Sequence, residues 1–215
     1  MALLHGDEAI GRFVESGKSH AQQILAMVEA VLAEAGVSLS MLDGIAASVG
    51  PGAFTGVRIS VAVAQGLAFG AGLRVAAVTT LEALALQAVR SGAAEVLACL
   101  DARMGEVYWG CFAADPAEGL VASSTARVGP PDSVVLPGAG VYRGIGRGLA
   151  AYPALAALPN LKLEPGDGRA LPNAREFARL GALRLNRGEG LDPADLQPMY
   201  LRDKVALTEA ERGVK

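Results

Sequence analysis

The stretch Gly50-Pro51-Gly52-Ala53-Phe54-Thr55-Gly56-Val57-Arg58-Ile59-Ser60 decides the fold that this sequence predicts. It follows a short apolar run over residues 45–49, which is typical of a buried strand, and it leads into an apolar run of helical length over residues 57–69. A glycine-rich turn between a strand and a helix points backbone N–H groups at an anion or at a partner. We expect Pro51 to keep Gly50 out of the helical region. Gly52 and Gly56 permit positive φ and close backbone approach, and Thr55 can cap the helix.

The spacing of this turn matches neither of two common nucleotide-binding loops. A P-loop ends in Gly-Lys-Ser/Thr, whereas Val57 and Arg58 follow Gly56 here. The dinucleotide fingerprint requires G-x-G-x-x-G, whereas this turn reads G-x-G-x-x-x-G. The spacing alone therefore fits two alternatives equally well: a strand-to-helix turn that binds no ligand, and a turn that binds one.

The composition favours a globular α/β protein that works through other proteins. The chain has 215 residues, enough for one or two domains, and 52% of them are hydrophobic, with 27 glycines. An abundance of alanine and valine suits helices packed on a parallel sheet. The formal net charge of −3 gives no general attraction to nucleic acid. A nucleic-acid-binding role for the chain on its own is therefore disfavoured.

The cysteines and the apolar runs predict a reduced, cytoplasmic protein. Cys99 and Cys111 lie in apolar, strand-like runs without CxxC spacing, so we expect buried thiols. The apolar start at residues 1–4 is too short for a signal peptide. The run over residues 57–69 falls short of the roughly 18 residues that a membrane span needs, and it contains Arg58 and Gln65.

The order of the predicted elements alternates strands with helices, which predicts the α/β class. In the first half we expect a strand over 9–15, a helix over 20–35 capped by Ser19 and ended by Gly36, a turn over 39–42, strand 45–49, helix 56–69, strand 74–78, a helix to 89 capped by Thr79 with Glu82, and strands 96–100 and 106–112. In the second half we expect strands 121–128 and 134–136, a glycine turn, helix 145–151, a loop over 153–172 and a helix to 187 opened by Asn173 with Glu176. We place a lobe boundary near residue 101, giving lobes 1–100 and 101–215.

Several motifs of the chain resemble the TsaB (YeaZ) family. They are GPGAFTGVRIS at 50–60 with the AQGLAFG and VTTLEAL that follow it, LDARMGEVY at 100–108, and YLRD at 200–203. The resemblance implies a two-lobed actin-like ATPase (ASKHA, ribonuclease H-like) fold. It also implies a non-catalytic partner of TsaD, which helps threonylcarbamoylate the adenosine beside the tRNA anticodon and recruits TsaE. ATP would then be used by the complex rather than by this chain, and tRNA would be reached only through the partner.

The resemblance further implies a partner-binding surface, because such chains pair with TsaD, and with themselves, through helices of the N-terminal lobe. The helix over 56–69 is apolar on all sides and so requires cover on all sides, of which the helix over 20–35 supplies part. Small residues recur along it at i+4 spacing and would permit close approach of another helix. The predicted partner-binding residues are His20, Ile24, Val28, Gly52, Phe54, Thr55, Gly56, Arg58, Ser60, Val61, Ala64 and Ala68.

Residues suited to catalysis or metal binding are missing where the resemblance would place them. TsaD-like enzymes carry an HxxxH metal pair, and the matching positions here hold Thr80 and Leu84, which are poor ligands. No HExxH motif is present. The charged residues Asp101, Arg103 and Glu106 are interpreted as ion pairs of a hairpin, not as an acid–base site. We therefore expect no catalytic residue and no metal site.

A nucleotide site is also weakly supported. TsaB-like chains begin with a strand ending in Asp-Thr-Ser/Ala, and residues 1–4 match the strand after it, so we expect that first strand and its Asp to be absent from this sequence. Gly138 and Gly140 are the weak candidates for nucleotide contact, and residues 202–204 are expected on an exposed tail. The rival hypotheses are an actin-like ATP-dependent kinase or acyl transferase acting alone, and an M22-type glycoprotease.

Overall fold

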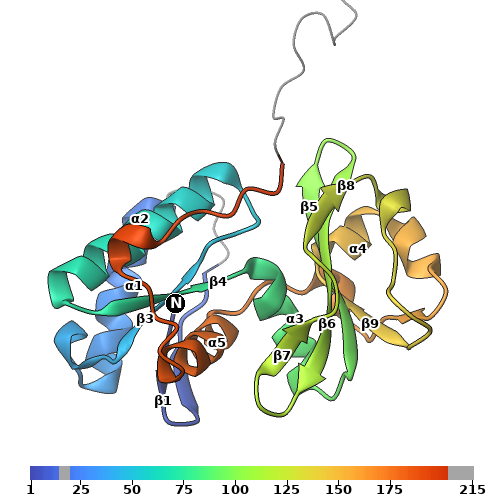
Figure 1. The fold of residues 1–215 in the computed structure, drawn as a ribbon. Helices are drawn as coiled ribbons and strands as arrows, with labels where there is room; N and C mark the ends of the chain where they lie inside the picture. Colours follow the sequence, from blue (N-terminus) through green and yellow to red (C-terminus); the bar gives the residue numbers. More distant parts are fainter. Residues whose placement is uncertain (15–19, 203–215) are drawn as a thin grey trace, which may run out of the picture.

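The chain forms two α/β lobes that lie beside each other in the computed structural model (Figure 1). The structure describes residues 1–14 and 20–202. The first lobe contains the strands β1 to β4, and the second lobe contains a six-stranded sheet formed by the later strands. The α/β class predicted from the alternating elements is confirmed.

Two small sheets and three helices build the first lobe. Strand β1 (Ala2–His5) pairs antiparallel with β2 (Glu8–Gly11), and β3 (Gly44–Ser48) pairs parallel with β4 (Arg74–Val78). Helix α1 (His20–Ala35) packs on the hairpin, and a 3-10 helix follows at Leu39–Met41, while α2 (Phe54–Ala71) and α5 (Ala174–Asn186) pack on β3 and β4. Among the described residues no strand joins the two small sheets, and the expected absence of a first strand stays a prediction.

Helices α2 and α5 cover opposite faces of the β3–β4 sheet. Neighbouring residues of a strand point to opposite faces. Ala47 belongs to the core cluster that contains Ala64 and Ala68 of α2. The preceding residue, Ala46, faces α5, where a Cβ on Gly181 would lie 2.3 Å from the Ala46 side chain. The absence of a side chain at Gly181 therefore lets α5 approach this sheet closely.

The second lobe is organised around β5 (Glu95–Arg103), which pairs antiparallel with β6 (Glu106–Asp115) and parallel with β9 (Tyr142–Ile145). Its edges are completed by β7 (Gly119–Ala122), β8 (Arg127–Gly129) and β10 (Leu161–Lys162). One face of the sheet packs on α3 (Thr80–Arg90) and the other contributes to a second core cluster with α4 (Arg147–Ala151). Short 3-10 helices of this lobe lie at Pro131–Ser133, Pro153–Ala157 and Asp167–Arg169, whereas the one at Pro193–Asp195 packs on α2 of the first lobe.

The C-terminal segment, residues 187–202, returns across the first lobe and ends between the two lobes (Figure 1). The backbone of Leu191 exchanges hydrogen bonds of 3.1 and 2.8 Å with Val75. Leu196 is fully buried against α2, and its carbonyl accepts a hydrogen bond from Gln65. The N–H of Met199 donates to the carbonyl of Val49 at 2.7 Å. The first lobe is therefore completed by residues from the far end of the chain.

Local sequence signals are confirmed where they act within one turn of helix. Thr79 and Glu82 form the predicted capping box at the start of α3, and the side chain of Asn173 caps α5. Gly36, with φ of 69°, follows the last residue of α1 as predicted. The bounds of β4 also match the prediction. The expected cap at Ser19 lies outside the described residues.

The glycine turn differs in detail from the prediction. Helix α2 begins at Phe54 with Ala53 at the N-cap, so Thr55 lies inside the first turn and does not cap the helix. The positive φ of 101° belongs to Gly50, and neither Gly52 nor Gly56 has positive φ. The reversal required by the turn therefore occurs at the residue before Pro51, and Gly56 is already helical. At the far end, Gly70 is helical and Gly72 ends the helix.

Several longer-range predictions are wrong. The boundary between lobes 1–100 and 101–215 does not follow the sheets, because β5 crosses it and α5 returns to the first lobe. The strand predicted over 121–128 is broken into β7 and β8, since residues 123–126 leave the ladder. Residues 134–136 follow a 3-10 helix and form no strand, whereas β9 and β10 were not predicted. The strand predicted over 9–15 ends at Gly11.

Candidate partner-binding site

The glycine turn is held in place by three parts of the chain. The carbonyl of Gly50 accepts a hydrogen bond of 2.7 Å from the N–H of Thr80, the first residue of α3. A Cβ on Gly50 would lie 3.3 Å from the carbonyl oxygen of Met199 and from the side chain of Val57. Gly50 is therefore required both by its positive φ and by the close approach of the C-terminal segment.

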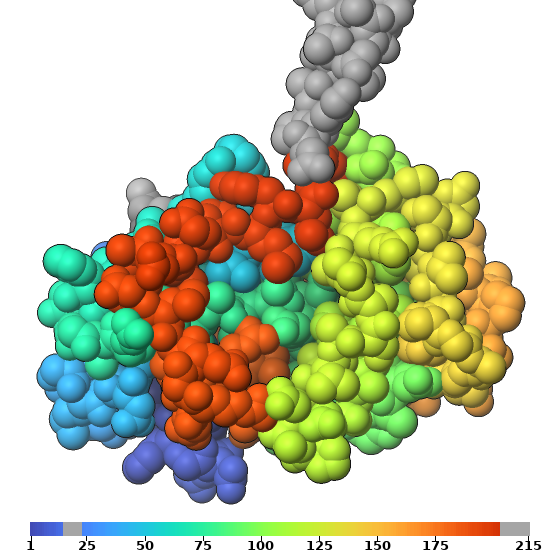
Figure 2. All heavy atoms as spheres, viewed as in Figure 1, coloured from blue at the N-terminus to red at the C-terminus, as the bar shows by residue number. Residues whose placement is uncertain are grey.

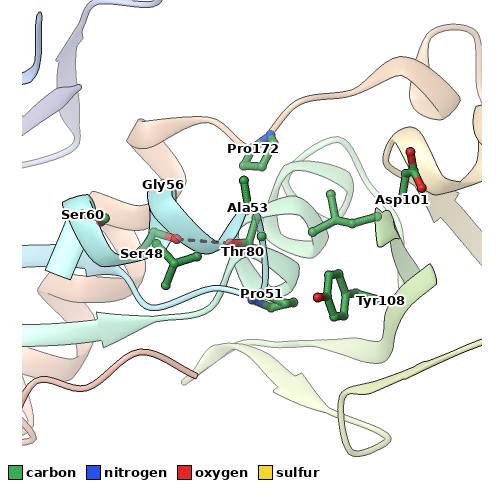
Figure 3. Close-up of a pocket in the computed structure, with 12 residues that line it drawn as sticks. Ser48, Pro51, Ala53, Gly56, Ser60, Thr80, Asp101, Tyr108 and Pro172 are labelled. Carbon is green, nitrogen blue, oxygen red and sulfur yellow. Dashed lines mark hydrogen bonds between the residues drawn. The ribbon is translucent and has the colours of Figure 1, made fainter. Parts of the chain in front are cut away.

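A pocket of about 310 Å³ lies between the turn and the second lobe (Figure 3). Figure 2 shows the surface hollowed between the C-terminal segment and the second lobe. The pocket's lining residues are Ser48, Pro51, Gly52, Ala53, Gly56, Val57, Ser60, Thr80, Leu100, Asp101, Tyr108 and Pro172. The hydroxyls of Ser48 and Thr80 lie 3.1 Å apart and satisfy each other. Among these lining residues Asp101 alone carries a charge, so the pocket offers no cationic side chain to a phosphate.

The inner side of α2 packs against its own sheet. Val57, Val61, Ala64 and Ala68 are buried. Three of the predicted partner-binding residues, Val61, Ala64 and Ala68, therefore lie in the core of the first lobe and cannot contact a partner in this structure. The predicted row of small residues at i+4 spacing consists of Gly56, Ser60, Ala64 and Ala68, and its first two members line the pocket. Only Ala64 and Ala68 of this row are therefore buried against the sheet, whereas Gly56 is exposed and Ser60 is half-buried.

The outer side of α2 remains uncovered. Phe54, Arg58, Ala62 and Phe69 are exposed, and their spacing of four, four and seven residues places them on one face of the helix. Phe54 is 59% exposed and Phe69 is 83% exposed. The guanidinium carbon of Arg58 lies 3.3 Å from the centre of the Phe54 ring and 5.3 Å from that of Tyr200. We call Phe54, Arg58, Ala62, Phe69 and Tyr200 the α2 outer face.

The remaining predicted partner residues surround this face or lie on α1. Gly52 and Thr55 are exposed beside Phe54. On α1, Ile24 and Val28 are half-buried. His20 is the first residue of α1, and its side chain lies outside the described residues. Phe69 and Tyr200 were not among the partner-binding residues predicted from the sequence. Phe69 lies on a helix that is apolar all round, and Tyr200 reaches α2 only through the returning C-terminal segment.

Helix α2 is longer than the sequence predicted, with 18 residues, and by length and hydropathy alone it could cross a membrane. Only 22% of this helix is buried, on the side where Val61, Ala64 and Ala68 pack against β3 and β4. Helices of this kind pass the same test of length and composition as membrane spans.

The two positions where catalytic relatives would hold a metal carry structural side chains. Leu84 is fully buried in the core between α3 and the sheet of the second lobe. The hydroxyl of Thr80 lies within hydrogen-bond distance of Ser48. Across residues 1–14 and 20–202, no group of three His, Cys, Asp or Glu side chains could hold a metal ion.

The charged residues of the β5–β6 hairpin pair with arginines. The carboxylate of Asp101 accepts a hydrogen bond of 2.8 Å from the backbone N–H of Arg103, whose guanidinium lies 3.1 Å away. Glu106 pairs with Arg202, which also donates to the carbonyl of Ala102 at 3.1 Å. The expectation that Arg202 lies on an exposed tail is wrong, because its side chain is only 17% exposed and connects the C-terminal segment to the second lobe.

The glycines proposed for nucleotide contact, Gly138 and Gly140, lie in one turn, where the carboxylate of Glu95 is close to Gly140. A Cβ on Gly140 would lie 1.7 Å from a carboxylate oxygen at the end of the Glu95 side chain, so a side chain at position 140 would displace that carboxylate. Gly138 supplies a positive φ of 75° to the same turn. Neither residue lines either of the two pockets that involve the end of β5. A carboxylate at this position would also repel a phosphate.

Comparisons with known proteins find relatives in tRNA threonylcarbamoyladenosine biosynthesis. Residues 14–120 match the family model described as TsaD, tRNA N6-adenosine threonylcarbamoyltransferase. The chain is 37% identical to the tRNA threonylcarbamoyladenosine biosynthesis protein TsaB of Escherichia coli (strain K12) over 96% of this chain and 90% of that protein. It is 32% identical to the protein of the same name from Haemophilus influenzae, over 95% of this chain and 89% of that one.

A solved structure also matches this fold along almost its whole length. A Pseudomonas aeruginosa protein described as similar to the peptidase YEAZ superposes with a TM-score of 0.86 at 40% identity, covering 94% of this chain and 93% of that one. The two-lobed α/β architecture and these matches fit the predicted actin-like fold.

Proposed function

The chain belongs to the TsaB family, whose relatives are named tRNA threonylcarbamoyladenosine biosynthesis proteins, and from that membership we propose that it serves this modification as a non-catalytic subunit. In this proposal it pairs with a TsaD-like transferase in the cytoplasm, holds that enzyme in its active conformation and helps recruit a TsaE-like ATPase. A subunit can shift its partner's conformation only by binding one conformation more tightly than another.

The observation that carries the proposal is the α2 outer face. Phe54 and Tyr200 lie against Arg58, and Phe69 is exposed further along the same face, on a helix whose other side is already packed. Aromatic residues and arginine are the side chains most often found at the energetic centre of protein interfaces. The family model named for TsaD matches residues 14–120, which include this helix. A TsaD-like partner with a similar lobe could therefore present a similar helix to this one.

The proposal that the chain is non-catalytic is supported by the roles of Thr80 and Leu84, which occupy the positions of the HxxxH metal pair. The buried Leu84 belongs to the hydrophobic core, and the Thr80 hydroxyl is engaged by Ser48, so both side chains serve the fold. The negative charge of Glu95 beside Gly140 would repel a phosphate, which supports the view that the complex, rather than this chain, uses ATP. We also infer that tRNA is held chiefly by the partner, because this chain carries a net charge of −3.

The proposal is tested by the assembly of purified proteins. We expect this chain and a TsaD-like partner to sediment as a heterodimer at micromolar concentrations in analytical ultracentrifugation. The chain alone should show no ATP hydrolysis above a blank containing denatured protein. Two separate components in the sedimentation run, or turnover of ATP by the chain alone, would contradict the proposal.

A further inference from the structure

A second pocket, of about 580 Å³, lies at the same end of β5 and is lined by arginines. It shares Leu100 and Asp101 with the pocket beside the glycine turn. Its other lining residues include Arg103, Arg147 and Arg169, which come from the β5–β6 hairpin, α4 and the Asp167–Arg169 helix. Three segments that are distant in sequence therefore bring guanidinium groups to one cavity.

Two glycines place Arg147 at the end of β5. A Cβ on Gly146 would lie 2.2 Å from the carbonyl oxygen of Cys99, and a Cβ on Gly148 would lie 2.5 Å from its sulfur. Real Cβ atoms do not approach other atoms this closely, so only glycines allow α4 to rest on this strand. Arg147, between them, is thereby held beside Leu100 and Asp101 at the pocket.

The other two arginines are positioned by their own segments, and the segment of Arg169 packs on α4. Arg103 has a left-handed backbone with φ of 63° at the tip of the hairpin, and its side chain is 86% exposed. Arg169 ends a 3-10 helix whose first residue, Asp167, is fixed by two hydrogen bonds from Arg143 of 2.7 and 2.8 Å. The N–H of Gly146 also donates to the carbonyl of Asp167 at 2.9 Å.

The charge balance of the pocket is the reverse of that of the whole chain. The chain has a formal charge of −3, whereas the pocket is lined by three guanidinium groups and a single carboxylate. That carboxylate, Asp101, already accepts from the backbone of Arg103 and pairs with its guanidinium. Arginine presents planar pairs of N–H donors that match the oxygens of a phosphate.

We propose that this pocket binds a phosphate group of an RNA backbone. The apolar lining consists of Leu100, Ala150 and Ala151. Among its lining residues, all within the described part of the chain, there is no aromatic ring to stack on a base and no amide to read a base edge. Arginines without such groups recognise the backbone and not the sequence. In the context of the proposed function, on which this assignment rests, the RNA is the tRNA to be modified.

The test compares RNA binding with ATP binding for matched double variants. Fluorescence anisotropy would follow a labelled anticodon stem-loop RNA titrated with the complex of this chain and its TsaD-like partner, and calorimetry would follow ATP. The test variant is Arg147→Gln/Arg169→Gln. The control is Arg74→Gln/Arg127→Gln, which removes the same charge from exposed positions outside the pocket. Sedimentation of each complex checks that the partner is still bound, which separates a failure here from a failure of the proposed function.

We expect the test variant to weaken RNA binding about tenfold and to lower the slope of log K against log salt by roughly 0.7 to 2, the loss of one or two phosphate contacts. The control should retain the wild-type affinity and slope. Equal losses in both variants would mean a general charge effect and would overturn the proposal. Wild-type RNA binding by the test variant, with or without a loss of ATP binding, would also overturn it.

Discussion

Replacing Phe69 by alanine should weaken the complex with a TsaD-like partner while leaving the isolated chain as stable as before. Phe69 is 83% exposed on the α2 outer face. A phenylalanine has about 200 Å² of surface to bury, so about 165 Å² of it remains available to a partner. At about 25 cal/mol per Å², this area corresponds to about 4 kcal/mol, of which an alanine would recover a part.

We therefore expect Phe69→Ala to cost about 2–3 kcal/mol of binding free energy, or roughly 30- to 150-fold in Kd. The free energy of unfolding of the isolated chain should change by less than about 0.5 kcal/mol, because the side chain makes few contacts within the fold. Isothermal titration calorimetry measures the first quantity, and urea denaturation measures the second.

The matched control for this variant is Val135→Ala. Val135 is 71% exposed on the second lobe, so its truncation also removes exposed apolar surface, but away from α2. We expect its Kd to match that of the wild type. A Phe69→Ala chain that is fully folded and binds the partner within twofold of the wild type would refute the assignment of this face.

Three further predictions concern the fold itself. Leu196→Ala should lower the free energy of unfolding by about 2–5 kcal/mol, because Leu196 of the C-terminal segment is fully buried against α2. A loss below about 1 kcal/mol in urea denaturation would show that the segment is not anchored there. Burial raises the pKa of Cys99 to about 12 and also raises that of Cys111, so at pH 8 only about one Cys99 in ten thousand is a thiolate, and a disulfide reagent should label neither thiol until urea is added. Burial raises the pKa of Glu176 above its ordinary value of 4.5, even though Arg90 and Arg179 act in the opposite direction. The stabilisation linked to its proton is complete below pH 4.5 and is lost as the pH rises through the folded-state pKa. As the pH rises from 4 to 7, the melting temperature of the wild type should therefore fall relative to that of Glu176→Gln. A rise of the wild-type melting temperature relative to the variant would contradict the direction of the pKa shift.

The parts of the fold that the sequence predicted correctly depend on local interactions. The capping box of Thr79 with Glu82 and the cap at Asn173 each act over three residues or fewer, and both helices start where these signals place them. The strand at 74–78 is bounded on one side by glycines and on the other by the cap of the next helix. Such signals survive folding because no distant contact competes with them.

The parts that were missed depend on contacts between distant segments. Helix α2 is apolar on every side, so its periodicity could not indicate which side meets the sheet, and Ala64 and Ala68 were assigned to a partner although they face the core. The first lobe is completed by α5 and by Leu196, more than 90 residues after β4, which no local pattern reveals. The same return of the chain brings Tyr200 to Phe54 and Arg202 to Glu106.

The most direct test of the proposed helper role is a reconstituted tRNA threonylcarbamoylation assay. It would contain the adenylate-forming enzyme, a TsaD-like transferase, a TsaE-like ATPase and unmodified tRNA, with and without this chain. We predict that modified adenosine accumulates only when the chain is present, and that adding Phe69→Ala at a concentration near the wild-type Kd restores only a small part of it. Equal modification with and without the chain would contradict the account.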